Sequence, residues 1–308
     1  MTITELSVRG PGPLLATHPH LINATAGAVT ASEAESAGQR EKGLEDLRIR
    51  IQSLKNDNPL SKFREDDLFL LCFLRSRRFD VDRAFKCYQK YYRVRSSHPA
   101  ILYPQGVGPL DRVKFFELNN VTLQPKRNPI DGSTIYIWRK GDWVPGTDWD
   151  LAEHLTPSYW MIEHALREPA VQQRGVQIII DGDGITWSML PYIKVMVFKV
   201  LVHTVQDAFP ARFRAIHIVN QPGLYDYIYA CIRPFLKAKI VKRIHLHGGN
   251  MESLHQHIDP EVLPSEYGGK AGPFSNDWIR KQLYARDEEF RRHSHYGFLR
   301  DPSAANAK

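Results

Sequence analysis

The stretch FPARFRAIHIVNQPGLYDYIYACIRPFLKAKIVKRIHLHGGN, residues 209–250, changes character four times and decides the fold. Residues 215–219 are rich in β-branched side chains and lie between Pro210 and Pro222, which predicts an interior strand. After Pro222 the apolar residues recur at helical spacing, so they predict a helix with one continuous apolar face. That face requires an apolar partner. Its members are Leu224, Tyr225, Ile228, Ile232, Phe235 and Leu236.

Cations border this apolar helix on both sides. Residues 209–243 hold seven Lys or Arg against one acid, Asp226, so their local charge is +6 in a chain whose net charge is +7. This composition is typical of a segment that works at an anionic membrane surface. A core helix beside a solvated basic face would show the same pattern. The residues alone leave both interpretations open.

The length and composition indicate a globular protein with room for two domains. The chain has 308 residues, of which 43% are hydrophobic and 24% are charged. The longest apolar run, residues 189–205, is interrupted by Pro191 and two lysines, so it predicts a buried helix and not a membrane span. Three dispersed cysteines argue against a disulfide framework and fit a reducing interior of the cell. The pI of about 9.2 favours anionic partners without choosing among them.

The N-terminal third predicts a tail followed by helices. Residues 1–40 are rich in Ala, Gly, Ser, Thr and Pro and lack the pattern of a signal peptide, so we expect a disordered tail. Residues 41–110 contain three helical patterns; the charges of Asp66 and Asp67 suit the N-terminus of the second, and Asp80 caps the third. These patterns predict a small helical bundle.

From residue 111 onward strands and helices alternate, which predicts an α/β fold with a mainly parallel sheet. The candidate strands are residues 115–123, 134–140, 176–181, 215–219 and 243–246, and the candidate helices are 150–168, 191–206 and 276–292. Apolar residues cover nearly the whole circumference of the 191–206 helix, so we expect it to be buried on more than one side. The sequence does not distinguish a filled core from a cavity wall there.

No motif for catalysis or for a resident metal is complete. His245, His247, His255 and His257 form two H-x-H pairs, the first expected on a strand and the second in a helix or turn, so we expect structural histidines that do not bind a metal. The DGDG sequence at 181–184 lacks the later ligands of a calcium loop and predicts a turn at the end of a strand. Phosphate-loop, dinucleotide and nucleophile-elbow motifs do not occur. We therefore expect no catalytic residue and no cofactor.

Four stretches of the chain, in this order, resemble the CRAL-TRIO lipid-binding family, in the branch of α-tocopherol transfer protein, clavesin and cellular retinaldehyde-binding protein. They are DDLFLLCFLRSRRFDVDRA (66–84), FPARFRAIHIVNQP (209–222), IRPFLKAKIVKRIHLHG (232–248) and LHQHIDPEVLPSEYGG (254–269). The resemblance implies an N-terminal helical domain over 41–110 and a CRAL-TRIO lipid-binding domain over 111–285 that encloses an apolar pocket. The end of the last helix and a flexible tail would occupy 286–308.

The resemblance also implies residues for each part of such a protein. Those expected to line the ligand pocket are Leu155, Ser158, Tyr159, Ile162, Ile180, Leu201, Val205 and Phe213. The helix described above would be a lid, formed by Leu224, Tyr225, Ile228, Ile232, Phe235 and Leu236. Those expected to bind phosphoinositide headgroups are Arg77, Arg212, Arg214, Lys239 and Arg243.

The function implied by the resemblance is that of a non-enzymatic carrier of a small hydrophobic ligand such as tocopherol, a retinoid or a similar lipid. The carrier would be a cytoplasmic monomer that associates peripherally with endosomal or other phosphoinositide-bearing membranes. Two alternatives stay open: a phosphoinositide-binding trafficking adaptor that transports nothing, and a lipid-modifying enzyme. A nucleic-acid binder is disfavoured because the cations border an apolar helix and not an aromatic-bearing sheet.

Overall fold

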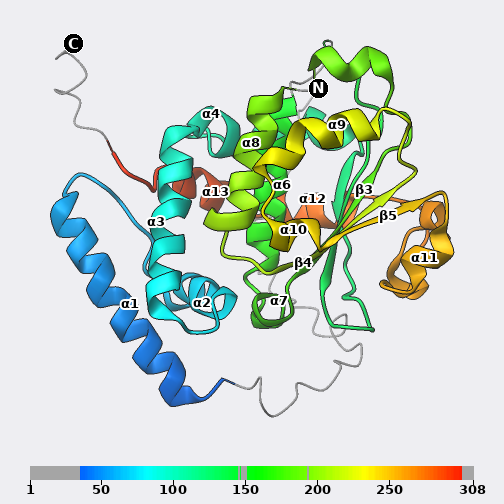
Figure 1. Cartoon of the computed structure of the whole chain (residues 1–308). Coiled ribbons are helices and arrows are strands. Elements are labelled where there is room, and N and C mark those ends of the chain that lie inside the picture. Colours follow the sequence, from blue (N-terminus) through cyan, green and yellow to red (C-terminus); the bar gives the residue numbers. More distant parts are fainter. Residues whose placement is uncertain (1–34, 145, 147–150, 193, 300–308) are drawn as a thin grey trace, which may run out of the picture.

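The fold combines a group of N-terminal helices with a five-stranded sheet (Figure 1). The computed structural model describes residues 35–144, 146, 151–192 and 194–299. Most of the predicted N-terminal tail, and the C-terminal tail from residue 300, lie outside these residues. The α-helices are α1 (Ala37–Asp57), α2 (Asp67–Ser76), α3 (Val81–Ser97), α4 (Pro99–Leu102), α5 (Val113–Glu117), α6 (Leu151–Ala165), α7 (Pro169–Arg174), α8 (Val195–His203), α9 (Tyr225–Ile232), α10 (Ala238–Val241), α11 (Met251–His255), α12 (Asp277–Tyr284) and α13 (Asp287–Ser294).

The first three helices form where the sequence predicts them. The carboxylates of Asp66 and Asp80 cap α2 and α3, each accepting a backbone N–H of the first turn, at 3.1 and 3.0 Å. Helix α1 begins at Ala37, earlier than the predicted start near Glu41. The cause is the Ser36 hydroxyl, which accepts the Gln39 amide at 3.1 Å and caps the helix there.

The sheet is mainly parallel, which confirms the predicted fold class. Its strands are β1 (Val121–Leu123), β2 (Thr134–Trp138), β3 (Val176–Asp181), β4 (Phe213–Val219) and β5 (Ile244–Gly248), and they are paired in that order. Only β1 runs antiparallel to its neighbour, β2, while β2 to β5 run parallel with helical crossovers between them. Strand β5 therefore forms one edge of the sheet.

The predicted strand over 115–123 is wrong in its first half. Residues Val113–Glu117 form helix α5, and only Val121–Leu123 pair in the sheet. The rings of Phe115 and Phe116 are both fully buried, 5.3 Å apart. A strand would point these neighbours to opposite faces, whereas one helical turn buries both on the same side.

The predicted burial of the 191–206 helix on more than one side fails at its first turn, whereas Val200 lies in the core and Phe198 and Val202 border an apolar cavity. Helix α8 begins at Val195, after a 3₁₀ segment (Trp187–Tyr192) that contains Pro191, and the side chains of Val195 and Met196 are 46% and 59% exposed. These residues belong to the first turn of the helix, where they meet solvent, and only Val197 and Val200 are buried. The last predicted helix is likewise interrupted, because α12 ends at Tyr284 and α13 begins at Asp287.

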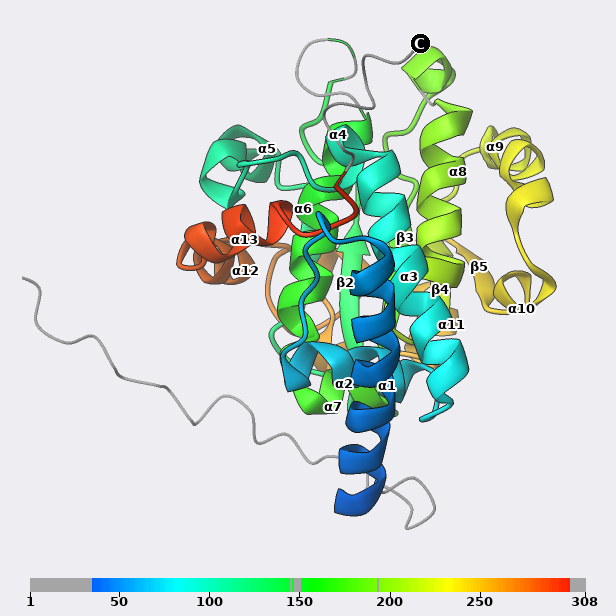
Figure 2. The same cartoon turned by 90° about the vertical axis from the view of Figure 1, so that its left-hand side faces the viewer.

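The two faces of the sheet pack against different layers. Helices α6 and α8 lie over one face, and α11 lies on the other (Figure 1). On the α11 side, Ile137, Ile179 and Val219 pack with Leu254 and Ile258 into a compact second core. Figure 2 shows α9 and α10 on the opposite side of the molecule from α12 and α13.

Candidate functional site

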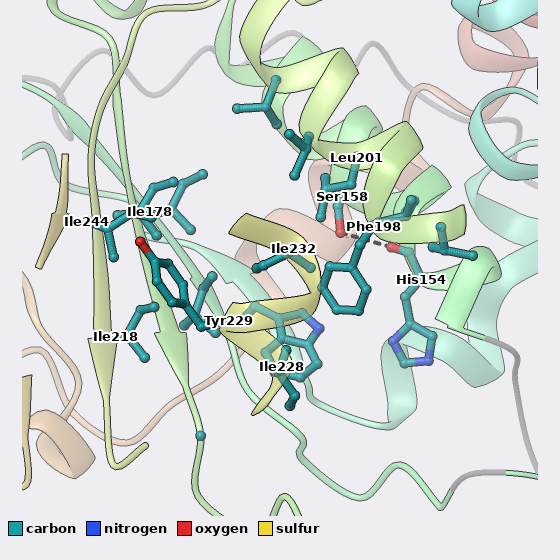
Figure 3. Close-up of a pocket in the computed structure, with 18 of the residues that line it drawn as sticks. His154, Ser158, Ile178, Phe198, Leu201, Ile218, Ile228, Tyr229, Ile232 and Ile244 are labelled. Atoms are coloured by element: carbon teal, nitrogen blue, oxygen red, sulfur yellow. Dashed lines mark hydrogen bonds between the residues drawn. The ribbon is translucent and has the colours of Figure 1, made fainter. Parts of the chain in front are cut away.

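An apolar cavity of about 300 Å³ lies between the sheet and helices α6, α8 and α9. Strand residues such as Ile178 and Ile218 face helix residues such as Phe198 and Leu201 across it (Figure 3). No aspartate, glutamate, lysine or arginine is found among the described residues that line it. An ionised ligand buried there would have no counter-charge in this lining, so the cavity suits a neutral apolar molecule.

All eight residues expected in a ligand pocket border this cavity. Leu155, Ser158, Tyr159 and Ile162 come from α6, Leu201 from α8, Val205 from the π-helical turn that follows α8, and Ile180 and Phe213 from strands. The sequence reasoning missed Tyr136, Ile178, Ile216, Ile218, Phe198 and Ile244, among others. The period-2 alternation of strands could have found several of them, because Ile178 shares a face with Ile180.

A small polar group interrupts the apolar lining on the α6 side. The hydroxyls of Tyr136 and Ser158 are 2.8 Å apart, and Ser158 Oγ donates to the backbone carbonyl of His154 at 2.9 Å. Burial raises the pKa of the Tyr136 phenol well above its usual range, so this group stays neutral. The cavity therefore offers hydroxyl groups to a ligand without offering a charge.

Helix α9 closes the cavity, and none of its residues is fully buried. Of the residues expected in a lid, Tyr225, Ile228, Ile232 and Leu236 line the cavity. The other two are Leu224, which is buried just before α9, and Phe235, whose ring lies 5.9 Å from the Lys199 ammonium. Residues 224–236 therefore form a thin cover over the cavity, and α9 within this cover contributes no buried residue to the core.

Polar contacts hold the C-terminal end of this cover. Gln206 donates to the Phe235 carbonyl at 3.1 Å and accepts the Lys237 amide at 2.7 Å, and Lys237 forms an ion pair with Asp207. Contacts of this kind exchange readily with water at an exposed site. Water can therefore replace these polar contacts, and the apolar contact of Leu236 with the cavity remains to hold this end.

Gly182 lines the cavity where β3 meets the turn that leads to the cover. A Cβ at this position would lie 2.7 Å from Pro222 Cδ and 2.8 Å from the Asn220 carbonyl oxygen. Only glycine allows the turn to approach the end of the strand so closely. The adjacent Asp181 accepts hydrogen bonds from Asn220 Nδ2 and the Tyr267 hydroxyl, both at 3.0 Å, and the predicted turn follows it.

A basic face lies beside the cover, where the end of α2 approaches α10 and the start of β5. Partial burial lowers the pKa of Lys239, and so do the positive charges of Arg243, Arg77, Arg83 and Arg78. Burial and the charge of Arg214 likewise lower the pKa of Arg243. The four charges that lower this pKa are all positive, so an anion bound here would relieve repulsion between these side chains.

The five residues expected at a phosphoinositide site differ in their partners. Arg77 and Lys239 belong to the basic face, and Arg243 adjoins it while donating to the Phe213 carbonyl. Arg214 forms an ion pair with Asp131 at 3.0 Å. Arg212 donates to the Arg75 carbonyl at 2.7 and 3.1 Å and to the Gln173 carbonyl at 3.0 Å, so it joins the end of α2 to the sheet.

The structure places His245 and His247 on β5, as predicted, and brings both of them together with His257 in the turn after α11. His245, His247 and His257 meet on the α11 face of the sheet around a fourth ring, His217 of β4. His255 lies apart, its Nε2 2.8 Å from the Tyr267 carbonyl oxygen. His217 joins the other rings because β4 pairs with β5 in the sheet. The spacing within each H-x-H pair of the sequence cannot predict this long-range contact. In the part of the chain that the structure describes, no group of three or more histidines, cysteines or carboxylates is arranged to hold a metal ion.

Comparisons of sequence place the chain among known proteins. A family model of the CRAL/TRIO domain matches residues 125–269. The alpha-tocopherol transfer protein-like protein of Mus musculus is 31% identical over 262 residues, which cover 85% of this chain and 75% of the relative. Clavesin-2 of Rattus norvegicus is 34% identical over 240 residues, covering 74% of this chain and 70% of the relative.

The fold also matches a solved structure. The crystal structure of Sfh5 superposes with a TM-score of 0.54 at 14% identity and covers 82% of this chain and 100% of that one. This likeness shows a shared fold. Among the described helices of the present chain, none has the length and apolar character that crossing a membrane requires.

Proposed function

Because this chain belongs to the CRAL/TRIO family, we propose that it is a lipid carrier that holds one small neutral hydrophobic molecule and exchanges it at phosphoinositide-bearing membranes. The observation that supports this best is the apolar cavity, which has no charged side chain among its described lining residues and is closed by α9. The name of the mouse relative makes tocopherol a reasonable cargo, and a retinoid or a similar neutral lipid has the same chemistry. The proposed carrier performs no covalent step and needs no cofactor.

The cavity supplies the energy for holding such a cargo. Each CH₂ group that leaves water for an apolar site contributes about 0.8 kcal/mol, so a lipid with ten buried carbons would be retained tightly. The hydroxyls of Tyr136 and Ser158 would orient the single polar atom of the cargo. Tight retention in turn requires a trigger for release.

The proposed trigger is contact between the cover and a membrane. Trp187, Met196 and Tyr227 are each more than half exposed, and the rings of Trp187 and Tyr227 lie 6.3 Å apart at the outer side of the cover. Exposed aromatic residues of this kind favour the membrane interface. Once they insert, the inner face of α9 can exchange its cavity contacts for acyl chains. The cargo then leaves along the same path.

The basic face would direct this contact to anionic lipids. Each Lys or Arg near an anionic surface contributes about 1 kcal/mol. Replacing Lys239 and Arg243 together by alanine is therefore expected to weaken binding to vesicles containing phosphatidylinositol bisphosphate by about 2 kcal/mol, or about thirtyfold. Loading of retinol, which fluoresces in an apolar site, should be unchanged because neither side chain lines the cavity.

A matched control removes two cations from the opposite side of the molecule. Lys281 of α12 and Arg292 of α13 are exposed, and these helices lie across the molecule from α10 in Figure 2. The double alanine variant at these positions has the same net charge as the test variant and should bind vesicles like the unmodified protein. Equal losses in both variants at physiological salt would mean that net charge, and not the basic face, governs binding.

Extraction separates the carrier from its main alternative. The protein purified from cells would be extracted with organic solvent, and the extract analysed by mass spectrometry for neutral lipids. A stoichiometric lipid is the expected result. A protein that is empty, does not load retinol and still binds vesicles would be a membrane adaptor without transport.

A further inference from the structure

Four histidine rings from three segments meet on the face of the sheet opposite to the cavity. The centroid of the His217 ring lies 5.2 Å from those of His245 and His247 on β5 and 5.1 Å from that of His257, in the turn after α11. The shortest separation, 4.6 Å, joins His245 to His257. This four-histidine cluster therefore connects the edge strand to the segment that covers it.

A chain of hydrogen bonds fixes the protons of two of these rings. Gln177 Nε2 donates to Asp131 at 3.2 Å, so Gln177 Oε1 accepts from His217 Nε2 at 2.7 Å. Neutral His217 then has an unprotonated Nδ1, which accepts from His247 Nε2 at 3.0 Å. A proton on His217 Nδ1 would oppose that donor, so His217 stays neutral.

His247 can accept a proton without losing a partner. Its Nδ1 lies 2.6 Å from Ser253 Oγ, and that hydroxyl also lies 2.8 Å from the Asn250 carbonyl oxygen. When Ser253 donates to the Asn250 carbonyl, a protonated His247 can donate to Ser253. This series of hydrogen bonds therefore accepts one proton, on His247, without losing a contact. Each further proton must enter a cluster that is already positive.

The cluster has no direct carboxylate partner among the described residues. From β3 the group that faces it is Gln177, whose Nε2 donates to Asp131, a carboxylate that also pairs with Arg214. From α11 the facing group is Ser253, while His255 bonds to the Tyr267 carbonyl and Glu252 is exposed. The charges that act on the rings of β4 and β5 are those of the other rings.

We propose that the four-histidine cluster is a proton sensor, which on acidification loosens β5 and the α11 segment and thereby speeds release of the cargo from the cavity. The sensor follows from the geometry alone, whereas the effect on cargo rests on the proposed function. Burial and the neighbouring rings lower the pKa of His217 to about 3, and burial and His257 lower that of His245. Both directions agree with a resting state in which the rings are neutral.

Repulsion acts where the edge strand meets its cover. Two charged rings about 5 Å apart near a protein surface weaken the binding of the second proton on the order of a hundredfold. The same interaction pushes His257 away from His245 once both are protonated. The other face of β5 presents Ile244 to the cavity, and the strand continues directly from α10 and the cover. Movement of β5 therefore opens the cavity wall at the end of the cover.

An anionic membrane supplies the protons at the place of docking. Its negative surface potential concentrates protons and lowers the local pH by roughly half a unit. The basic face lies at the start of β5, so docking would bring the cluster into this layer. The sensor would then favour release at the membrane over release in solution.

Hydrogen exchange of the full-length, ligand-free protein tests the sensor. Exchange would be followed by mass spectrometry at pH 7.4 and 5.5, with correction for the intrinsic pH dependence of amide exchange. We expect residues 244–258 to open about tenfold more often at pH 5.5, while α2 stays unchanged. The double variant His245→Gln with His257→Gln should lose this response. The control His295→Gln, at an exposed histidine directly after α13, should retain it.

Release of retinol into neutral vesicles tests the link to the cavity. Acidification should speed release in the unmodified protein and in His295→Gln, but not in the double glutamine variant. Circular dichroism at pH 7.4 checks that this variant folds, and the single variant His257→Gln, in the partly exposed turn, provides a milder test. Equal acid responses in all variants, or acid opening of 244–258 without faster release, would overturn the proposal. Failure to load retinol would count against the carrier function alone, because the exchange measurement needs no ligand.

Discussion

Replacing Arg212 by alanine is expected to destabilise the fold while leaving membrane binding largely intact. The guanidinium donates to two carbonyl oxygens, one at the end of α2 and one at the end of α7, and so holds both against β4. The family resemblance assigns this residue to the phosphoinositide site. Its contacts instead favour a structural role, and the two roles make opposite predictions.

The magnitude follows from the contacts that are lost. A hydrogen bond from a charged donor contributes about 1.5 kcal/mol or more, so two satisfied carbonyls correspond to about 3 kcal/mol. Arg212 is half-buried, and water replaces part of this in the variant. We therefore expect the free energy of unfolding to fall by about 2 kcal/mol, which shifts the urea midpoint by roughly 0.7 M at an m-value near 3 kcal/mol/M.

Arg212→Lys separates charge from geometry. The variant keeps the positive charge, but one ammonium cannot span both carbonyls as the planar guanidinium does. Its urea midpoint should lie close to that of Arg212→Ala, and its binding to phosphoinositide vesicles should equal that of the unmodified protein. Lys239→Ala is the reverse control. It removes an exposed cation of the basic face, so binding should weaken while the free energy of unfolding changes by less than about 0.5 kcal/mol.

The result that would refute this reasoning is specific. If Arg212→Ala kept its urea midpoint and lost as much vesicle binding as Lys239→Ala, the guanidinium would leave its carbonyls for a headgroup. The contacts at 2.7–3.1 Å would then describe only a resting state.

Two further predictions concern acidity and the cover. Burial and the charges of Arg64 and Arg95 lower the pKa of His293 to about 3, so its contribution to stability is present above pH 6.5 and is lost as the pH falls from 6.5 toward 3; at pH 5 the loss is about 2 kcal/mol. Urea unfolding should show that His293→Gln loses less free energy of unfolding between pH 7 and pH 5 than the unmodified protein does. Equal losses in the two proteins would contradict this. Ile228→Asp places a carboxylate against the apolar cavity and should speed retinol release at least tenfold, as measured by fluorescence. The exposed position Ala230→Asp on the same helix is the control, and equal rates in both variants would argue against α9 as a lid.

Local patterns in the sequence were enough to predict most of the architecture. The cap at Asp80 and the bounds of β3 depend on residues within one turn or one strand, and both were predicted correctly. The mainly parallel order followed from strands separated by helices. The errors arose where burial depends on distant partners, as for Phe115 and Phe116, whose helix fits a core shared with α12.

The candidate site likewise has features that the sequence predicts and features that only the tertiary structure shows. The sequence by itself determined that residues 224–236 form an apolar face beside a concentration of cations, because helical spacing and charge are local properties. Only the tertiary structure decided that this face covers a cavity, since an unfilled volume depends on where the sheet, α6 and α8 meet. It also decided that Arg212 binds carbonyls and that His217 joins three other rings, because parallel pairing brings together residues that are far apart in the chain.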